Sequence, residues 1–347
     1  MAKKKSAVED IVFYIDAKGS DKNDGSENSP FATIGRALKS AYEAAKKNDI
    51  KYAALVVSGT LRLKGPECAA AGDTLHDTND ETAIIIANKD LPHIILRGKS
   101  EKKAGILDAQ GNKRVIGIGT GNTLILRDHI TITGGKEGGV CVEGSFIMEG
   151  GTISGNTAFN GAAVFVSDLE ELQSSFVLRG GIIKDNTVTY PRHIKGCGGS
   201  ICGGVIMEGG TIANTEGGRG IRYEGGIGEV VIKGGVIENN TLGGISIYCS
   251  SLKMSGGVIR NNTSDAGGGI SVYEEEEDFQ QTFIMEGGEI YGNSADNTGG
   301  GVRLHNCNFI MTGGTIENNS ADGGGDNVYV GEGSSFEGDL EDGVDYE

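Results

Sequence analysis

The chain has 347 residues, of which 60 are glycine, four are proline and none is tryptophan. This glycine content is too high for an ordinary globular protein, and the proline content and triplet repeat of collagen are missing. The net charge of −17 argues against binding to the phosphate backbone of nucleic acids, which requires a basic surface. The sequence contains no run of about 18 apolar residues, so we predict no membrane span.

The first five residues, MAKKK, lead into polar sequence rather than into the apolar core of a signal peptide. If Met1 is the native start, the protein is cytoplasmic. We favour the alternative that a leader was removed, and expect an extracellular or cell-surface location. The six cysteines form no CxxC pair, which argues against zinc. We expect free thiols, and only Cys197 and Cys202 are close enough in sequence for a local disulfide.

The first predicted elements are a strand over 13–16 and a polar turn over 19–30 that is dense in turn-forming residues. Within this turn Asp21, Asn23 and Asp24 resemble part of a calcium-binding loop, although the downstream bidentate Glu is missing. Calcium is the one cofactor for which the sequence offers candidate ligands, and we expect no other.

A helix is predicted over 31–47, with Thr33 or a nearby serine as its N-cap. Its apolar residues recur at helical spacing and are Ile34, Ala37, Leu38, Ala41 and Tyr42. The first coil of a solenoid leaves its core open, and an amphipathic helix can cover it. We therefore assign residues 1–52 to an N-terminal strand, turn and capping helix.

From residue 146 onward one sequence motif occurs seven times at intervals of 22 to 31 residues. The copies are FIMEGGTISGNT (146–157), FVLRGGIIKDNT (176–187), VIMEGGTIANTE (205–216), VVIKGGVIENNT (230–241), LKMSGGVIRNNT (252–263), FIMEGGEIYGNS (283–294) and FIMTGGTIENNS (309–320). This spacing fits one coil of a β-solenoid and is too short for a propeller blade. Less regular apolar runs over 53–133 predict earlier coils. We assign the coils to 53–335 and a frayed acidic tail to 336–347.

The repeat also predicts which side chains face the core. Its first and third residues are apolar, which is typical of a strand with those side chains inward, and an Ile follows each glycine pair. Three residues after this Ile stands a column of asparagines, interrupted at Thr215: Asn156, Asn186, Asn240, Asn262, Asn293 and Asn319. We interpret the column as an amide ladder at a sharp corner; a row of ligand-binding amides is the alternative.

A second strand per coil is predicted from phrases such as GGISIY (243–248) and GGGISVY (267–273). Strands that recur at this short interval, with glycine-rich corners between them, are typical of a solenoid whose coils stack in parallel. The sequence therefore predicts an all-β right-handed parallel β-helix with an N-terminal capping α-helix.

The residue before the glycine pair alternates in charge through Glu149, Arg179, Glu208 and Lys233. A catalytic hypothesis pairs Glu149 with Glu208 as acid and base, two coils or about 9 to 10 Å apart, as in inverting glycosidases. The alternative, which we favour, is a surface salt-bridge ladder in which Arg179 pairs with both carboxylates and keeps them ionised.

A further acid-base trio is Arg127, Asp128 and His129. If these residues lie on a strand, neighbours point to opposite faces, so at most Arg127 and His129 can share one.

Candidate ligand-binding residues follow the second strand of each coil. Tyr248, Tyr273 and His305 occupy the outward position there on three successive coils, and stacked rings can receive the faces of sugars. A purely structural aromatic ladder is the alternative. Two insertions, 167–175 and 273–281, fall at the same predicted corner, where they can form the wall of a groove.

Two resemblances concern families. IRNNTSDAGGGI (259–270), IYGNSADNTGGGV (290–302) and ISGNTAFNGAAV (153–164) resemble the repeats of polymorphic outer-membrane-protein adhesins, with Ile where that family has Phe and Gly or Ala where it has GGA. FYIDAKGSDKNDGSENSPFATIGRAL (13–38) resembles the opening of pectate-lyase-like parallel β-helix proteins. The resemblances imply a surface-exposed β-helix that is adhesive or acts on polysaccharide, with a carbohydrate or a host or cell-surface component as partner.

Three functions follow from these observations. We favour a surface-exposed or secreted adhesion or scaffold protein without catalytic activity. The alternatives are a polysaccharide lyase or glycoside hydrolase, which requires carboxylates and a basic residue converging on one face, and a non-catalytic carbohydrate-binding module, which requires an exposed strip of Tyr248, Tyr273 and His305.

Overall fold

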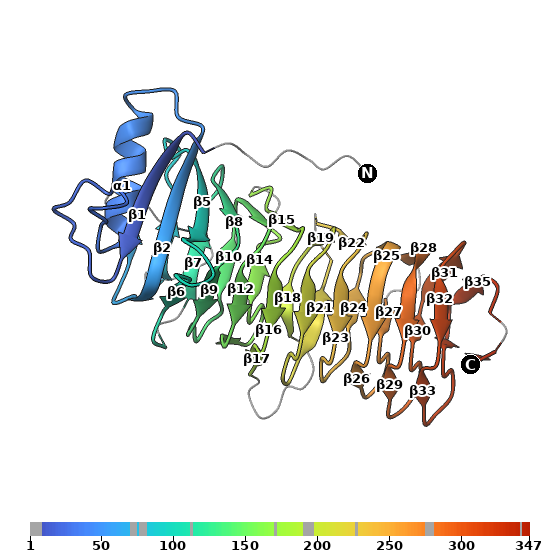
Figure 1. Cartoon of the computed structure of the whole chain (residues 1–347). Coiled ribbons are helices and arrows are strands. Elements are labelled where there is room, and N and C mark those ends of the chain that lie inside the picture. The colour runs from blue at the N-terminus through green and yellow to red at the C-terminus, as the bar shows by residue number, and fades with distance from the viewer. Residues whose placement is uncertain are drawn as a thin grey trace.

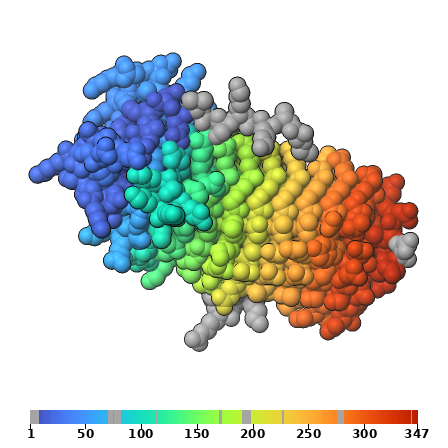
Figure 2. All heavy atoms as spheres, viewed as in Figure 1, coloured from blue at the N-terminus to red at the C-terminus, as the bar shows by residue number. Residues whose placement is uncertain are grey.

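The computed structural model describes residues 9–69, 75, 82–111, 114–169, 172–189, 198–225, 228–274, 281–340 and 342–347. Short strands succeed one another along a single axis (Figure 1), and in a space-filling view the coils form bands along an elongated body (Figure 2). The described strands form sheets of 19, 12, three and two strands, and neighbouring strands pair in parallel. The predicted parallel β-helix with an N-terminal helix is confirmed.

The largest sheet contains two strand segments from most coils. Its strands are β1 (Ile11–Asp16), β2 (Tyr52–Arg62), β5 (His93–Gly98), β6 (Gly105–Asp108), β8 (Thr123–Leu126), β9 (Ile130–Thr133), β11 (Ser145–Met148), β12 (Thr152–Ser154), β15 (Ser175–Leu178), β16 (Ile182–Lys184), β19 (Val205–Met207), β20 (Thr211–Ala213), β22 (Val230–Ile232), β23 (Val236–Glu238), β25 (Leu252–Arg260), β28 (Gln281–Tyr291), β31 (Cys307–Met311), β32 (Thr315–Glu317) and β35 (Ser335–Glu337).

The second sheet contains one strand from each coil. Its strands are β3 (Glu67–Cys68), β4 (Thr82–Ile86), β7 (Arg114–Ile118), β10 (Val140–Val142), β14 (Val164–Val166), β18 (Gly199–Cys202), β21 (Arg219–Tyr223), β24 (Ile245–Tyr248), β27 (Ile270–Tyr273), β30 (Val302–His305), β34 (Val328–Val330) and β36 (Val344–Tyr346). The two small sheets join β13 (Thr157–Ala158) to β17 (Thr187–Val188), and β26 (Thr263–Ser264) to β29 (Ser294–Ala295) and β33 (Ser320–Ala321).

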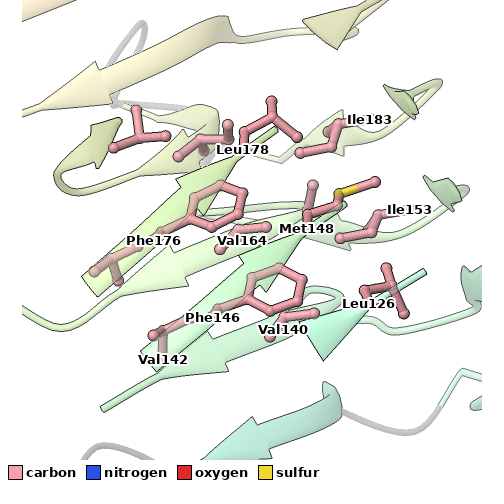
Figure 3. Packing of buried hydrophobic residues seen from close by; sticks show 14 of the residues in the cluster. Leu126, Val140, Val142, Phe146, Met148, Ile153, Val164, Phe176, Leu178 and Ile183 are labelled. Atoms are coloured by element: carbon pink, nitrogen blue, oxygen red, sulfur yellow. The ribbon is translucent and has the colours of Figure 1, made fainter. Parts of the chain in front are cut away.

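The core consists of inward columns of identical or similar side chains. Figure 3 shows Phe146 beside Phe176 and Ile153 beside Ile183 on successive coils, and strand register pairs each of these residues with its partner. The two phenylalanine rings stack with centroids 5.0 Å apart, and all four side chains are buried. Burial of apolar area in such a column stabilises by roughly 25 cal/mol per Å², which ties each coil to the next.

The predicted asparagine ladder is present inside the corner that follows β12, β16 and their equivalents. The Asn262 amide donates to Asn293 Oδ1 at 2.9 Å, and the Asn293 amide donates to Asn319 Oδ1 at 3.0 Å. At the break, the Thr215 backbone N–H still donates to Asn240 Oδ1, at 3.0 Å. The residue before each ladder position has a positive φ, as at Asp185 (53°) and Asn261 (55°), which asparagine, aspartate and glycine tolerate best.

The capping helix is α1 (Ile34–Ala45), which is shorter than the predicted range of 31–47. Its N-cap is Thr33, as predicted: the hydroxyl accepts from the backbone N–H of Arg36 at 3.1 Å. Residues Ile34 and Leu38 are buried against the first coil, and Figure 1 shows α1 at the N-terminal end of the solenoid. The Glu67 carboxylate from β3 accepts from the Gly35 N–H at 2.7 Å, which ties the helix to the sheet.

The sheets continue across both predicted domain boundaries. Strand β1 pairs with β2 over six residues, so the N-terminal strand is already part of the first coil. At the other end β36 pairs with β34, and β35 pairs with β31. The acidic segment 336–347, expected to be frayed, therefore contains paired strand in the described residues, because its Val344 continues the inward column of Val302 and Val328.

Candidate functional site

The structure brings the catalytic candidates together as a salt-bridge ladder. The Arg179 guanidinium lies 3.0 Å from the Glu208 carboxylate and 3.6 Å from that of Glu149, so it pairs with both. Arg127, one coil earlier, lies 3.1 Å from Glu149 on the other side. Each candidate carboxylate thus has an arginine partner, as the salt-bridge ladder predicts.

The ladder extends into the first coil through Glu9. This carboxylate lies 2.9 Å from the Arg97 guanidinium and 3.3 Å from that of Arg127. The hydrogen bond from Arg97 holds the pKa of the Glu9 carboxyl below its usual value, with a further contribution from the Arg127 charge. Glu9 thereby contacts two arginines of neighbouring coils whose like charges would otherwise repel each other.

The assumption that Arg127, Asp128 and His129 lie on a strand is wrong. They form the turn between β8 and β9, where His129 has a φ of 63° and its carbonyl accepts from the Gly105 N–H. The sequence does not reveal this left-handed residue, because a positive φ is uncommon in any residue other than glycine. Arg127 pairs with the Glu9 and Glu149 carboxylates of the ladder.

The calcium candidates have separate structural partners. The Asp21 carboxylate accepts from the backbone N–H groups of Ala32 and Thr33 at 2.9 and 3.0 Å, beside the start of α1. The Asn23 amide donates to the Pro30 carbonyl, and Asp24 accepts from a nearby N–H of its own turn. In the described part of the chain no three His, Cys, Asp or Glu side chains group as metal ligands. Calcium at these residues stays a prediction.

The ligand-binding candidates line up as predicted. Tyr248 pairs in register with Tyr273, and Tyr273 with His305, at the ends of β24, β27 and β30. The two tyrosine rings have centroids 4.7 Å apart with planes tilted by 32°, and all three side chains are half-buried. We call these three residues the tyrosine strip. Its partly exposed rings offer apolar surface with polar tips, which suits the face of a sugar.

A second column, two residues earlier on the same strands, was not predicted. It runs through Arg222, Ser246, Ser271 and Arg303 on four successive coils, in register. Because residues two apart on a strand share a face, this column lies beside the tyrosine strip. The only sequence signal for this column is the alternation of inward Ile and outward Ser in ISIY and ISVY. Because serine is common at outward positions of strands, this signal does not indicate a binding site.

The two serines of this column, Ser246 and Ser271, lie at the floor of a hollow of about 200 Å³. Tyr273 and Arg303 line it together with Ser246 and Ser271. Its rim comes from other segments, namely Arg219, Leu242 and the loop of Ser264, Asp265 and Ala266. The two serines are only 1% and 6% exposed, so they lie at the bottom of the hollow. The outer face of β24, β27 and β30 thus combines stacked rings with a polar recess.

The two insertions occupy the same corner, as predicted, because each leads from the 12-stranded to the 19-stranded sheet, after β14 and after β27. Residues 170–171 and 275–280 of these insertions lie outside the described residues. The first insertion borders a hollow of about 450 Å³ through Ser167 and Asp168. In the second, Glu274 is buried and accepts from the Cys249 thiol at 3.3 Å.

Two of the cysteines are free thiols that are held in their protonated form. Cys202 and Cys307 are free thiols, and burial raises the pKa of each to about 12, so both stay protonated at neutral pH. Cys197, which we considered as a disulfide partner of Cys202, lies outside the described residues.

Comparisons with known proteins give little beyond this geometry. The chain matches no protein-family model and no curated protein, so the resemblance to adhesin repeats has no support there. A solved structure called rhamnogalacturonan lyase is similar with a TM-score of 0.39 and 13% identity, over 96% of this chain and 83% of that one. A similarity at this level does not carry the lyase activity over. Among the described residues no helix is long and apolar enough to span a membrane.

Proposed function

We propose that this protein is a non-catalytic adhesion or scaffold protein that binds carbohydrate through the tyrosine strip. The observation that carries the proposal is the adjacent pair of Tyr248 and Tyr273, whose rings are 4.7 Å apart and partly exposed and are held in register by β24 and β27. Sugars pack their apolar C–H faces on such rings, and the neighbouring hydroxyl groups can accept and donate hydrogen bonds.

The paired state of the catalytic candidates supports a binding role over an enzymatic one. An inverting glycosidase needs one carboxyl that stays protonated near neutral pH and a second that activates water. Arginines contact both Glu149 and Glu208, so that both carboxylates already have partners in the ladder. A lyase or hydrolase active at these residues is therefore the less favoured function.

We further propose an extracellular or cell-surface location, where carbohydrate partners are presented. The acidic net charge of −17 suits a protein that stays soluble without binding nucleic acid.

The test is binding to a glycan array by the wild-type protein and by Tyr273→Ala. We expect wild-type binding that falls at least tenfold in Tyr273→Ala, because the variant removes one ring of the stacked pair. Tyr291→Ala is the matched control, since Tyr291 lies on the 19-stranded sheet and should leave binding unchanged. Equal binding by Tyr273→Ala would contradict the proposal.

A parallel assay measures the release of unsaturated or reducing-end products from acidic and neutral polysaccharides, with and without calcium. We expect no turnover by the wild-type protein. Turnover that is lost in Glu149→Gln would instead establish the enzymatic alternative.

A further inference from the structure

We propose that the hollow beside the tyrosine strip binds one isolated oxyanion group of the carbohydrate, a carboxylate or a sulfate ester. This inference rests on the proposed function, because it concerns a substituent of the same glycan. The rings of the tyrosine strip alone would recognise only the apolar faces of sugars. A charged contact in the hollow would add recognition of a charged substituent.

The first observation is the difference between the two arginines of the column. Arg222 donates through Nε and Nη2 to the Glu224 carboxylate, at 2.9 and 2.8 Å, and through Nη1 to Ser246 at 3.1 Å. Its charge is thus neutralised within the protein. The Arg303 side chain makes no ion pair or hydrogen bond with any described residue, and its Nε is buried without a hydrogen-bond partner. A buried N–H without a partner is destabilising, and a ligand oxygen would satisfy it.

The second observation is where Arg303 lies. It lines the hollow together with Ser271, one coil away in register, and with the aromatic ring of Tyr273. A planar guanidinium presents two parallel N–H donors that match a carboxylate or sulfate, and a serine hydroxyl can add a third donor. The donors and the ring border one recess, so a sugar packed on Tyr273 can direct a substituent toward Arg303.

The size and charge of the hollow limit the ligand to a single charged group. Its volume of about 200 Å³ is below the 300 to 1,000 Å³ typical of sites that enclose a whole small molecule. Arg303 brings a positive charge to this lining, in a chain of net charge −17. The single charge of Arg303 favours one anion, whereas the surrounding negative charge opposes a polyanion.

The experiment uses an array that carries each neutral disaccharide beside its 6-O-sulfated form and beside a form capped by one glucuronate. We expect the wild-type protein to prefer at least one charged form over its neutral parent by tenfold or more. The preferred arm distinguishes a sulfate from a carboxylate. Polygalacturonate should bind no more tightly than the singly charged glycan.

Arg303→Gln should abolish the preference for the charged form while retaining binding of the neutral parent, which also shows that the variant is folded. Arg303→Lys keeps the charge but loses the paired donors, so we expect a reduced preference. Arg62→Gln removes an exposed arginine on β2 and serves as the control for net charge. A preference that survives in Arg303→Gln would overturn the inference.

The two proposals fail in different ways. If the wild-type protein binds neutral and charged forms equally, and binding still depends on Tyr273, only the oxyanion site is wrong. If it binds no glycan at all, the proposed function falls as well.

Discussion

Thr215 replaces asparagine within the ladder, and its hydroxyl is buried without a hydrogen-bond partner. Substitution Thr215→Asn should restore the amide and raise the free energy of unfolding by about 1 kcal/mol, the net value of one hydrogen bond in a protein. The restored Oδ1 would lie next to Asn186, whose amide already donates to two backbone carbonyls. Urea denaturation at neutral pH measures the change.

Thr215→Val is the matched control, because it removes the unsatisfied hydroxyl at nearly constant volume without adding an amide. If the ladder explains the effect, Thr215→Asn should be more stable than Thr215→Val. A lower urea midpoint for Thr215→Asn than for the wild type would contradict the prediction.

At the residue scale the sequence predicts what repeats and misses what does not. An inward Ile such as Ile153 or Ile183 recurs in every copy of the repeat, and the ladder asparagine recurs in every copy except the one with Thr215, so stacking alone assigns their roles. Arg303 is different, because its importance depends on lacking a partner. Whether the Arg303 side chain has a partner depends on the surrounding loops, so the sequence of its own repeat does not predict it.

At the scale of the element, Glu67 couples the stability of α1 to pH. Burial raises the pKa of the Glu67 carboxyl above its ordinary value of 4.5, and the N–H of Gly35 opposes this shift only in part. A carboxyl with a raised pKa contributes stability that is complete below the unfolded pKa and is lost as pH rises through the folded pKa. The stability of the wild type relative to Glu67→Gln should therefore fall as the pH rises above 4.5, as measured by urea unfolding at each pH.

Glu9 provides a control of opposite sign. Because Arg97 and Arg127 lower its pKa, its contribution is present above the unfolded pKa and is lost as pH falls through the folded pKa. The stability of the wild type relative to Glu9→Gln should therefore rise with pH below the unfolded pKa, near 4.5, and should be constant above it. If both differences have the same sign, the assignment of Glu67 is wrong.

The elements themselves follow from sequence to different degrees. Helix α1 is predicted with its N-cap, because Ile34, Leu38 and the capping Thr33 are local signals. The turn at Arg127 to His129 is not, since its geometry depends on the coil before it, where the Gly105 N–H meets the His129 carbonyl.

For the whole molecule, the two ends of the solenoid differ. Helix α1 covers the first coil, whereas β32 pairs only with β28 and has no following partner strand in the described residues. A hollow of about 660 Å³ opens at this end beside Met311 and Ile316. Local opening should therefore begin at the C-terminal coil.

Hydrogen-deuterium exchange measured by mass spectrometry tests this expectation. Amides of β32 should exchange faster than those of β23, which has β20 on one side and β25 on the other. Both strands have the same length and the same inward Ile, so the neighbouring coil is the main difference between them. Equal protection of the two strands would contradict the expectation.

The column of Arg222, Ser246, Ser271 and Arg303 takes one residue from each coil. Duplication or deletion of a whole coil between the arginines would change their separation by one strand spacing, about 4.8 Å, while the inward columns stayed continuous. The distance between groups that contact a ligand can therefore change in fixed increments through gain or loss of repeats. Evolution or design could use this property to fit the same scaffold to glycans with differently spaced substituents.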